Sequence, residues 1–159
     1  MSTYRIPKVH TLTSALGRAR KYCAYQERSQ QEVRDKLYDL GLHKNEVEQG
    51  IAILIEDGFL NEQRFAVAFA GGKFRINKWG KVKILLALKA KKVSDYCIRH
   101  ALNQISTSDY EKTLLKVLDG RKKKLAASDP VKMNYQLAQY AIGRGFEPET
   151  VWNVLKINE

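Results

Sequence analysis

Few side chains in this sequence stand at spacings that could support catalysis or bind a metal. The three histidines, His10, His43 and His100, lie far apart and form no HExxH or similar pattern. Cys23 and Cys97 form no CxxC pair, so they predict two buried thiols rather than a zinc site or a disulfide framework. We therefore expect that the chain is not an enzyme and that it needs no metal and no cofactor.

One glycine pair superficially matches a phosphate-binding loop. Gly71-Gly72-Lys73 lacks the upstream glycine of GxxxxGK[ST], and Phe74 stands where that motif has Ser or Thr. The segment also follows a predicted helix, whereas the phosphate loop follows a strand. The glycine pair is instead expected to loosen or end the helix in which it lies.

The basic residues carry the stronger signal, because they are distributed unevenly. The formal net charge is +11, and residues 59–105 alone hold 10 Lys/Arg against 2 Asp/Glu. Residues 1–58 have a net charge of only +1 and residues 106–159 of +2. A chain made basic for solubility alone has no reason to concentrate its charge in the middle third. The distribution predicts a partner with dense negative charge.

The candidate binding residues are the cations of this middle third and a second basic cluster further along the chain. On a helical wheel Lys78, Lys81, Lys89 and Lys92 fall within an arc of about 80°, and Trp79 beside them could stack on a base. No set of Arg, Asn and Gln suited to reading base edges is present, so we expect non-specific binding to phosphates. The alternative is an ordinary solvated face, with Trp79 in the core. The candidates are Arg64, Lys73, Arg75, Lys78, Lys81, Lys83, Lys89, Lys91, Lys92, Arg121, Lys122, Lys123 and Lys124.

The elements that must position these cations are predicted to be helices. Apolar residues recur at helical spacing in nine segments, and no run approaches the roughly 18 apolar residues of a membrane span. The N-terminus lacks the apolar stretch of a signal peptide, so a cytoplasmic protein is expected. Ser29, Asn61 and Ser94 are predicted N-caps, Glu32 completes a capping box after Ser29, and Gly41 is a predicted left-handed C-cap.

Apolar positions recur at a nearly constant offset, which predicts an internal repeat. Four columns match across three units, with an offset of 51 residues from the first unit to the second and 53 from the second to the third. We expect an all-α fold of three tandem three-helix repeats, at residues 14–58, 59–105 and 106–159, in an elongated, curved array. The columns are Val33, Ile84 and Leu137; Leu37, Leu88 and Ala141; Leu42, Val93 and Phe146; and Val47, Ile98 and Val151.

The stretch from Glu56 to Asp95 resembles the central signature of bacterial RecX proteins. Its most specific elements are Gly58-Phe59-Leu60-Asn61, Arg64-Phe65-Ala66 and Lys78-Trp79-Gly80, with Leu88 one helix later. Residues 14–105 carry most of the resemblance, because the first unit also matches through Tyr25, Arg28-Ser29, Glu32, Leu37 and Gly41. The family usually has glycine where this chain has Lys92. A residue other than glycine there must adopt a left-handed conformation or form a different turn.

The resemblance implies a regulator of the RecA recombinase, and we expect this chain to be a monomer. Members of the family lie in the helical groove of the RecA–DNA filament, where they generally suppress strand exchange and ATP hydrolysis during DNA repair and the SOS response. Two alternatives stay open from the residues alone. The chain could be a stand-alone DNA-binding protein of the helix-turn-helix type, or a protein-interaction scaffold whose lysines are incidental.

Overall fold

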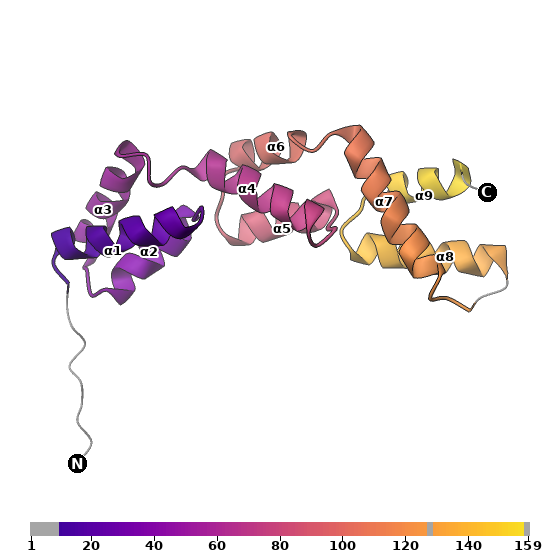
Figure 1. Ribbon diagram of the computed structural model, residues 1–159, viewed down its shortest axis with the longest axis horizontal. Helices are drawn as coiled ribbons and strands as arrows, with labels where there is room; N and C mark the ends of the chain where they lie inside the picture. Colours follow the sequence, from indigo (N-terminus) through magenta and orange to yellow (C-terminus); the bar gives the residue numbers. More distant parts are fainter. Residues whose placement is uncertain (1–9, 127–128, 158–159) are drawn as a thin grey trace, which may run out of the picture.

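The computed structural model describes residues 10–126 and 129–157, and in these ranges the chain is entirely helical apart from its turns. The first three helices are α1 (Leu12–Tyr25), α2 (Gln30–Asp39) and α3 (Lys44–Glu56). They are followed by α4 (Glu62–Arg75), α5 (Lys81–Ala90) and α6 (Asp95–Asn103), and then by α7 (Thr107–Lys122), α8 (Pro130–Gly143) and α9 (Pro148–Ile157). Figure 1 shows the three groups of helices side by side along one long axis. The predicted all-α array of three-helix repeats is confirmed.

The predicted repeat columns form the cores of these groups. Each of the twelve matched residues is buried, and none is more than 6% exposed. The first column lies on the middle helix of each group and the fourth on the last helix, so equivalent side chains meet at equivalent places. The periodicity of the sequence therefore reports the packing directly.

The buried side chains do not form three separate cores. One cluster extends from Ala15 to Leu60 and belongs to the first group of helices. A second cluster runs from Phe65 to Leu155 and is shared by the second and third groups. We keep 14–58, 59–105 and 106–159 as proposed repeat boundaries, although two of these repeats share one apolar interior.

The turn after the middle helix has the same backbone design in every repeat. Gly41, Lys92 and Gly145 have positive φ angles of 91°, 61° and 101°. The N–H groups of the residues that follow, Leu42, Val93 and Phe146, donate to carbonyls five positions earlier at 3.2 or 3.3 Å. This is the Schellman arrangement that ends a helix. Lys92 thus adopts the left-handed conformation expected if the turn is kept without glycine.

The predicted caps are present as well. The side chains of Ser29, Asn61 and Ser94 accept bonds from backbone N–H groups three residues later. Ser29 also donates to the Glu32 carboxylate at 3.2 Å, so these two residues interact in both directions. Local sequence signals therefore set the starts of α2, α4 and α6.

Two local predictions are wrong. Gly71-Gly72 does not loosen or end α4, which continues to Arg75. The space above Gly71 is taken by the Arg75 guanidinium, one turn later on the same helix: a Cβ at Gly71 would lie 2.5 Å from its nearest nitrogen. The helical wheel assumed one helix from Lys78 to Lys92, and this helix is too long. Lys78 and Lys92 lie outside α5 and have positive φ angles.

Candidate nucleic-acid interface

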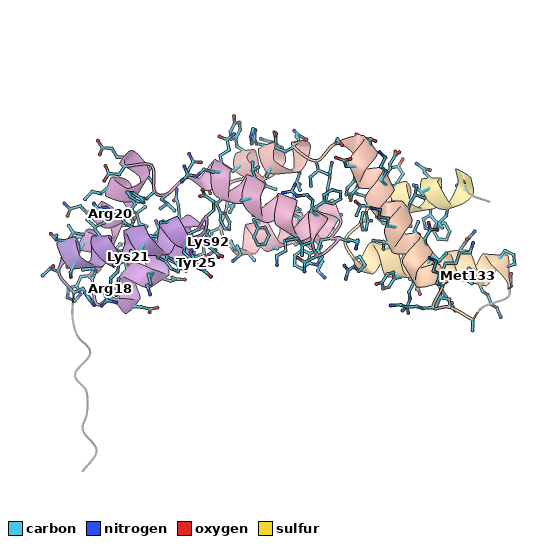
Figure 2. The ribbon with its side chains drawn as sticks, viewed as in Figure 1. Arg18, Arg20, Lys21, Tyr25, Lys92 and Met133 are labelled. Atoms are coloured by element: carbon cyan, nitrogen blue, oxygen red, sulfur yellow. The ribbon has the colours of Figure 1, made fainter. Side chains whose placement is uncertain are left out.

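The cations of the second repeat come from α4, α5 and the turns at both ends of α5. Lys78 is exposed in the turn before α5, whereas Lys89 and Lys92 are exposed at and after its end. Figure 2 shows Lys92 at the end of the second repeat that faces the first repeat. The four lysines therefore do not lie on one face of a single helix, as the predicted arc required.

Trp79 is the centre of one small cationic group. Its ring is half-buried against the apolar core, and the ammonium groups of Lys73 and Lys83 lie 4.9 and 4.5 Å from its centroid. Cations at this distance are attracted to the ring face and restrict access to it. Trp79 thus positions two lysines, and its role as a platform for a base stays a prediction.

Lys81 lies at a contact between the second and third repeats. Its ammonium is 4.9 Å from the Tyr110 ring centroid, and its backbone N–H donates to the Tyr110 hydroxyl at 2.9 Å. That hydroxyl donates to the Glu147 carboxylate at 2.5 Å. Burial, and then the bond to Glu147, raise the pKa of Tyr110 well above its ordinary value. Lys81 is therefore a poor choice for a test of charge alone.

Two glycines complete this contact between the second and third repeats. The Gly80 N–H donates to the Arg144 carbonyl, and the Val82 N–H donates to the Gly145 carbonyl, each at 2.9 Å. A Cβ on Gly80 would lie 2.2 Å from the backbone of Gly145 and Phe146. Only glycine allows these two backbone segments to approach so closely.

Two of the predicted cations bind acids of the first repeat. Arg64 forms an ion pair with Glu27, and Lys91 forms one with Glu32 at 3.3 Å. The middle third itself contains only two acids, Glu62 and Asp95, but acids of the neighbouring repeat also reach its cations. Within the described residues the other eleven candidate cations form no ion pair.

The second basic cluster lies where α7 ends. The Arg121 guanidinium stacks on the Tyr140 ring at 4.8 Å, which ties it to α8. Lys122, Lys123 and Lys124 are exposed at the end of α7, where cations also suit the negative end of the helix dipole. The three lysines are the more exposed part of this cluster, whereas Arg121 is half-buried.

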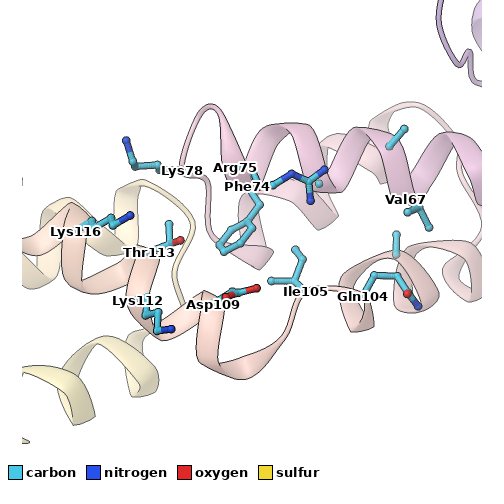
Figure 3. A pocket seen from close by; sticks show the side chains of 13 residues that line it. Val67, Phe74, Arg75, Lys78, Gln104, Ile105, Asp109, Lys112, Thr113 and Lys116 are labelled. Carbon is cyan, nitrogen blue, oxygen red and sulfur yellow. The ribbon is translucent and has the colours of Figure 1, made fainter.

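A pocket at the junction of the second and third repeats gathers cations that the sequence pattern did not bring together. It has a volume of about 420 Å³, and its rim carries Arg75 and Lys78 from the second repeat and Lys112 and Lys116 from α7. Figure 3 shows these four side chains around the ring of Phe74. Lys112 and Lys116 were missed because residues 106–159 have a low net charge. Their spacing of four residues, which puts them on one helix face, was the available signal.

The described residues contain no cluster of His, Cys, Asp and Glu that could hold a metal ion. Cys23 and Cys97 are buried free thiols, as predicted, and burial raises the pKa of Cys23. Within the same ranges no helix is both long and apolar enough to cross a membrane.

Two family models match the chain. Residues 15–52 match the first three-helix domain of RecX, and residues 61–102 match the second. Together these matches span 80 of the 159 residues. The second match includes most of the basic segment and the turn that contains Trp79.

Curated relatives with the name Regulatory protein RecX are similar over most of the chain. The protein of Clostridium perfringens (strain 13 / Type A) is 29% identical over 124 residues, which cover 76% of this chain and 57% of that protein. The protein of Clostridium acetobutylicum is 29% identical over 146 residues, which cover 89% of this chain and 67% of that protein. The matched regions thus span only about half to two thirds of the length of such relatives.

Solved structures show the same architecture. The crystal structure of RecX from Lactobacillus salivarius superposes with a TM-score of 0.85 at 19% identity, covering 92% of this chain and 95% of that one. A second structure, of regulatory protein RecX, has a TM-score of 0.82 at 18% identity, covering 92% of this chain and 71% of that one. At this identity the likeness concerns the fold, whereas the two family models establish the relationship. The chain belongs to the RecX family.

Proposed function

We propose that this protein binds the RecA–DNA filament and inhibits its recombinase and ATPase activities, as a non-enzymatic regulator in DNA repair and the SOS response. It acts in the cytoplasm as a monomer and contacts DNA through phosphates without sequence preference. The observation that carries the proposal is an elongated member of the RecX family whose middle repeat exposes cations without acidic partners.

The shape of the molecule supports a filament as the partner. Three repeats in a row present a long surface, which suits a groove better than it suits a small ligand. Exposed cations on this surface add attraction for phosphates, and such attraction weakens as salt increases. Both features favour a long polyanionic assembly.

The test measures ATP hydrolysis by RecA on single-stranded DNA at increasing concentrations of this protein. In one variant the exposed residues Lys78, Lys89 and Lys92 are replaced by Glu, and Lys81 is left intact because it contacts Tyr110. We expect the wild-type chain to inhibit and this variant to need at least about ten-fold more protein, since charge-reversed contacts repel phosphates.

A matched control makes the same change of charge elsewhere. Arg18, Lys21 and Lys44 are exposed cations of the first repeat that form no ion pair within the described residues, and their replacement by Glu should leave inhibition nearly unchanged. If the wild-type chain leaves RecA unaffected, the proposed function is wrong. If both variants inhibit equally well, the basic surface has no part in it.

A stand-alone DNA-binding protein of the helix-turn-helix type is the second candidate, favoured by the three-helix form of each repeat. It requires tight binding to a preferred duplex sequence without RecA. Competition with random-sequence duplex distinguishes the two candidates, because a preference above about ten-fold favours the helix-turn-helix function.

A further inference from the structure

We propose that the pocket at the junction of the second and third repeats holds one nucleotide of a single strand, with its phosphates on the cationic rim and its base on the apolar floor. The inference rests on the proposed function, because it names a subsite for the DNA of the filament. It makes a separate prediction, since binding to a free oligonucleotide requires no RecA.

The charges around the pocket are strongly unbalanced. Four cations line it and Asp109 is its one acidic lining residue. No acid of the described chain lies within ion-pair distance of Arg75, Lys78, Lys112 or Lys116. Like charges that line one pocket without ion-pair partners repel one another, and a bound anion relieves that repulsion.

Three different features of the backbone place the four cations. Arg75 folds back over Gly71, where the missing side chain leaves room for its guanidinium. Lys78 leaves the chain from a residue with a φ angle of 54° in the turn before α5. Lys112 and Lys116 lie on one face of α7, about 6 Å apart along its axis. Phosphates that follow each other along an extended strand can therefore meet successive lysines.

The floor of the pocket distinguishes a nucleotide from a simple anion. Val67, Phe74 and Ile105 line it, and Gln104 adds a polar amide. In Figure 3 Lys112, Lys116 and Lys78 lie toward one end, and Val67 and Gln104 lie toward the other. A nucleotide likewise has a charged phosphate at one end and a flat aromatic base at the other. The pocket volume of about 420 Å³ is also within the range of small-ligand sites.

A nucleic-acid strand fits this surface better than an acidic peptide does. Lys123 lies seven residues after Lys116 at the end of α7, so exposed lysines continue along the helix beyond the pocket. A strand supplies one phosphate per nucleotide at regular intervals along such a row, and a guanidinium binds phosphate through two parallel bonds. Gln104 is the one amide side chain among the pocket-lining residues, so base edges are poorly read and the site should show little preference among bases.

The experiment measures the affinity of the full chain for a fluorescent oligodeoxythymidylate by anisotropy over a salt series. Lys112→Glu combined with Lys116→Glu should weaken binding at least about ten-fold and reduce the log–log salt slope by about 1.4, the value for two lost phosphate contacts on a single strand. Lys132→Glu combined with Lys156→Glu makes the same charge change at exposed positions outside the pocket, and should alter neither quantity by as much.

A second variant tests the pocket without a change of charge. Gly71→Ala adds a methyl group where the Arg75 guanidinium lies, and the three atoms nearest to that methyl all belong to this flexible side chain. The variant should fold and should be no less stable to heat than the wild-type chain, because alanine favours helix over glycine. It should nevertheless bind the oligonucleotide about three-fold more weakly, since one charge-assisted contact is displaced.

The possible outcomes separate the two proposals. Equal affinity and equal salt slope for the pocket and control variants would overturn the nucleotide site, even if the wild-type chain inhibits RecA. Displacement of the oligonucleotide by polyglutamate as readily as by unlabelled strand would also overturn it, in favour of an acidic protein partner. A pocket-dependent salt slope in a chain that leaves RecA ATPase unaffected would support the site and contradict the proposed function.

Discussion

At the scale of single residues, Lys92 shows how the repeat tolerates a departure from its own pattern. Gly41 and Gly145 occupy the equivalent turns, and all three residues have a positive φ angle. A side chain in this conformation costs roughly 1 to 2 kcal/mol, because its Cβ approaches the following carbonyl. The turn is kept because the buried Val93 and its bond to the Leu88 carbonyl require it.

We therefore expect Lys92→Gly to raise the free energy of unfolding by about 0.5 to 1 kcal/mol, less than the full strain because glycine also gains freedom in the unfolded chain. Urea denaturation measures the change. Gly41→Ala is the control at the equivalent turn and should lower stability by about 1 kcal/mol. A destabilised Lys92→Gly variant would contradict this account of the turn.

Tyr110 predicts a specific response to alkaline pH. Its pKa is near 10 in the unfolded chain and higher in the folded protein, because of burial and the bond to Glu147. Above pH 10 the unfolded state loses the phenolic proton while the folded state keeps it. The free energy of unfolding should then fall as pH rises, by up to about 1.4 kcal/mol per pH unit from this group.

Tyr110→Phe provides the comparison. At neutral pH the variant should be less stable by about 1 to 3 kcal/mol, because the Lys81 N–H and the Glu147 carboxylate lose a buried partner. Between pH 10 and 11 its stability should fall less steeply than that of the wild-type chain. Parallel curves for the two proteins in this range would show that Tyr110 does not control the alkaline transition.

At the scale of elements, the contact between the turn before α5 and the turn after α8 depends on Gly80 and Gly145. Gly80→Ala should lower the free energy of unfolding by about 3 kcal/mol or more, since the added carbon meets backbone and the contact must open. Gly120→Ala is the control: nothing lies within 4 Å of its Cβ in the interior of α7, so stability should rise by about 0.5 to 1 kcal/mol. Thermal unfolding monitored by circular dichroism measures both, and a mild effect of Gly80→Ala would contradict the close approach.

The sequence predicts the helices well where residues a few positions apart determine them. Apolar spacing gave the four buried columns, and Ser29, Asn61 and Ser94 marked helix starts, because caps and helix faces depend on neighbours within a few residues. The pairing of Arg64 with Glu27 and the pocket that Lys112 shares with Arg75 were missed. Both join residues that are 37 positions apart in the chain, and no periodic pattern encodes the angle between neighbouring repeats.

At the scale of the whole molecule, the apolar interior is divided unequally. The first repeat has its own buried cluster, whereas the second and third share one. The ion pairs of Arg64 and Lys91 across the first junction are partly exposed, and such pairs contribute only about 0 to 1 kcal/mol each. We expect the two clusters to unfold independently.

Leu54→Ala and Leu114→Ala test this division, because both leucines are fully buried but belong to different clusters. Each change should cost about 2 to 5 kcal/mol within its own cluster. Hydrogen exchange should show faster exchange in α1–α3 alone for Leu54→Ala, and in α4–α9 together for Leu114→Ala. Equal acceleration along the whole chain in both variants would indicate one cooperative unit.

The unequal junctions also determine how the protein can follow a partner that changes shape. We expect the molecule to bend at the first junction, where no apolar cluster is shared, and to stay straight at the second. The flexible arm then contains one repeat, and the rigid arm contains two. When the helical pitch of a filament partner changes, the arm formed by α1–α3 can reorient while α4–α9 remain bound. If the protein binds such a filament, we expect binding to be lost in two steps, with the shorter arm released first.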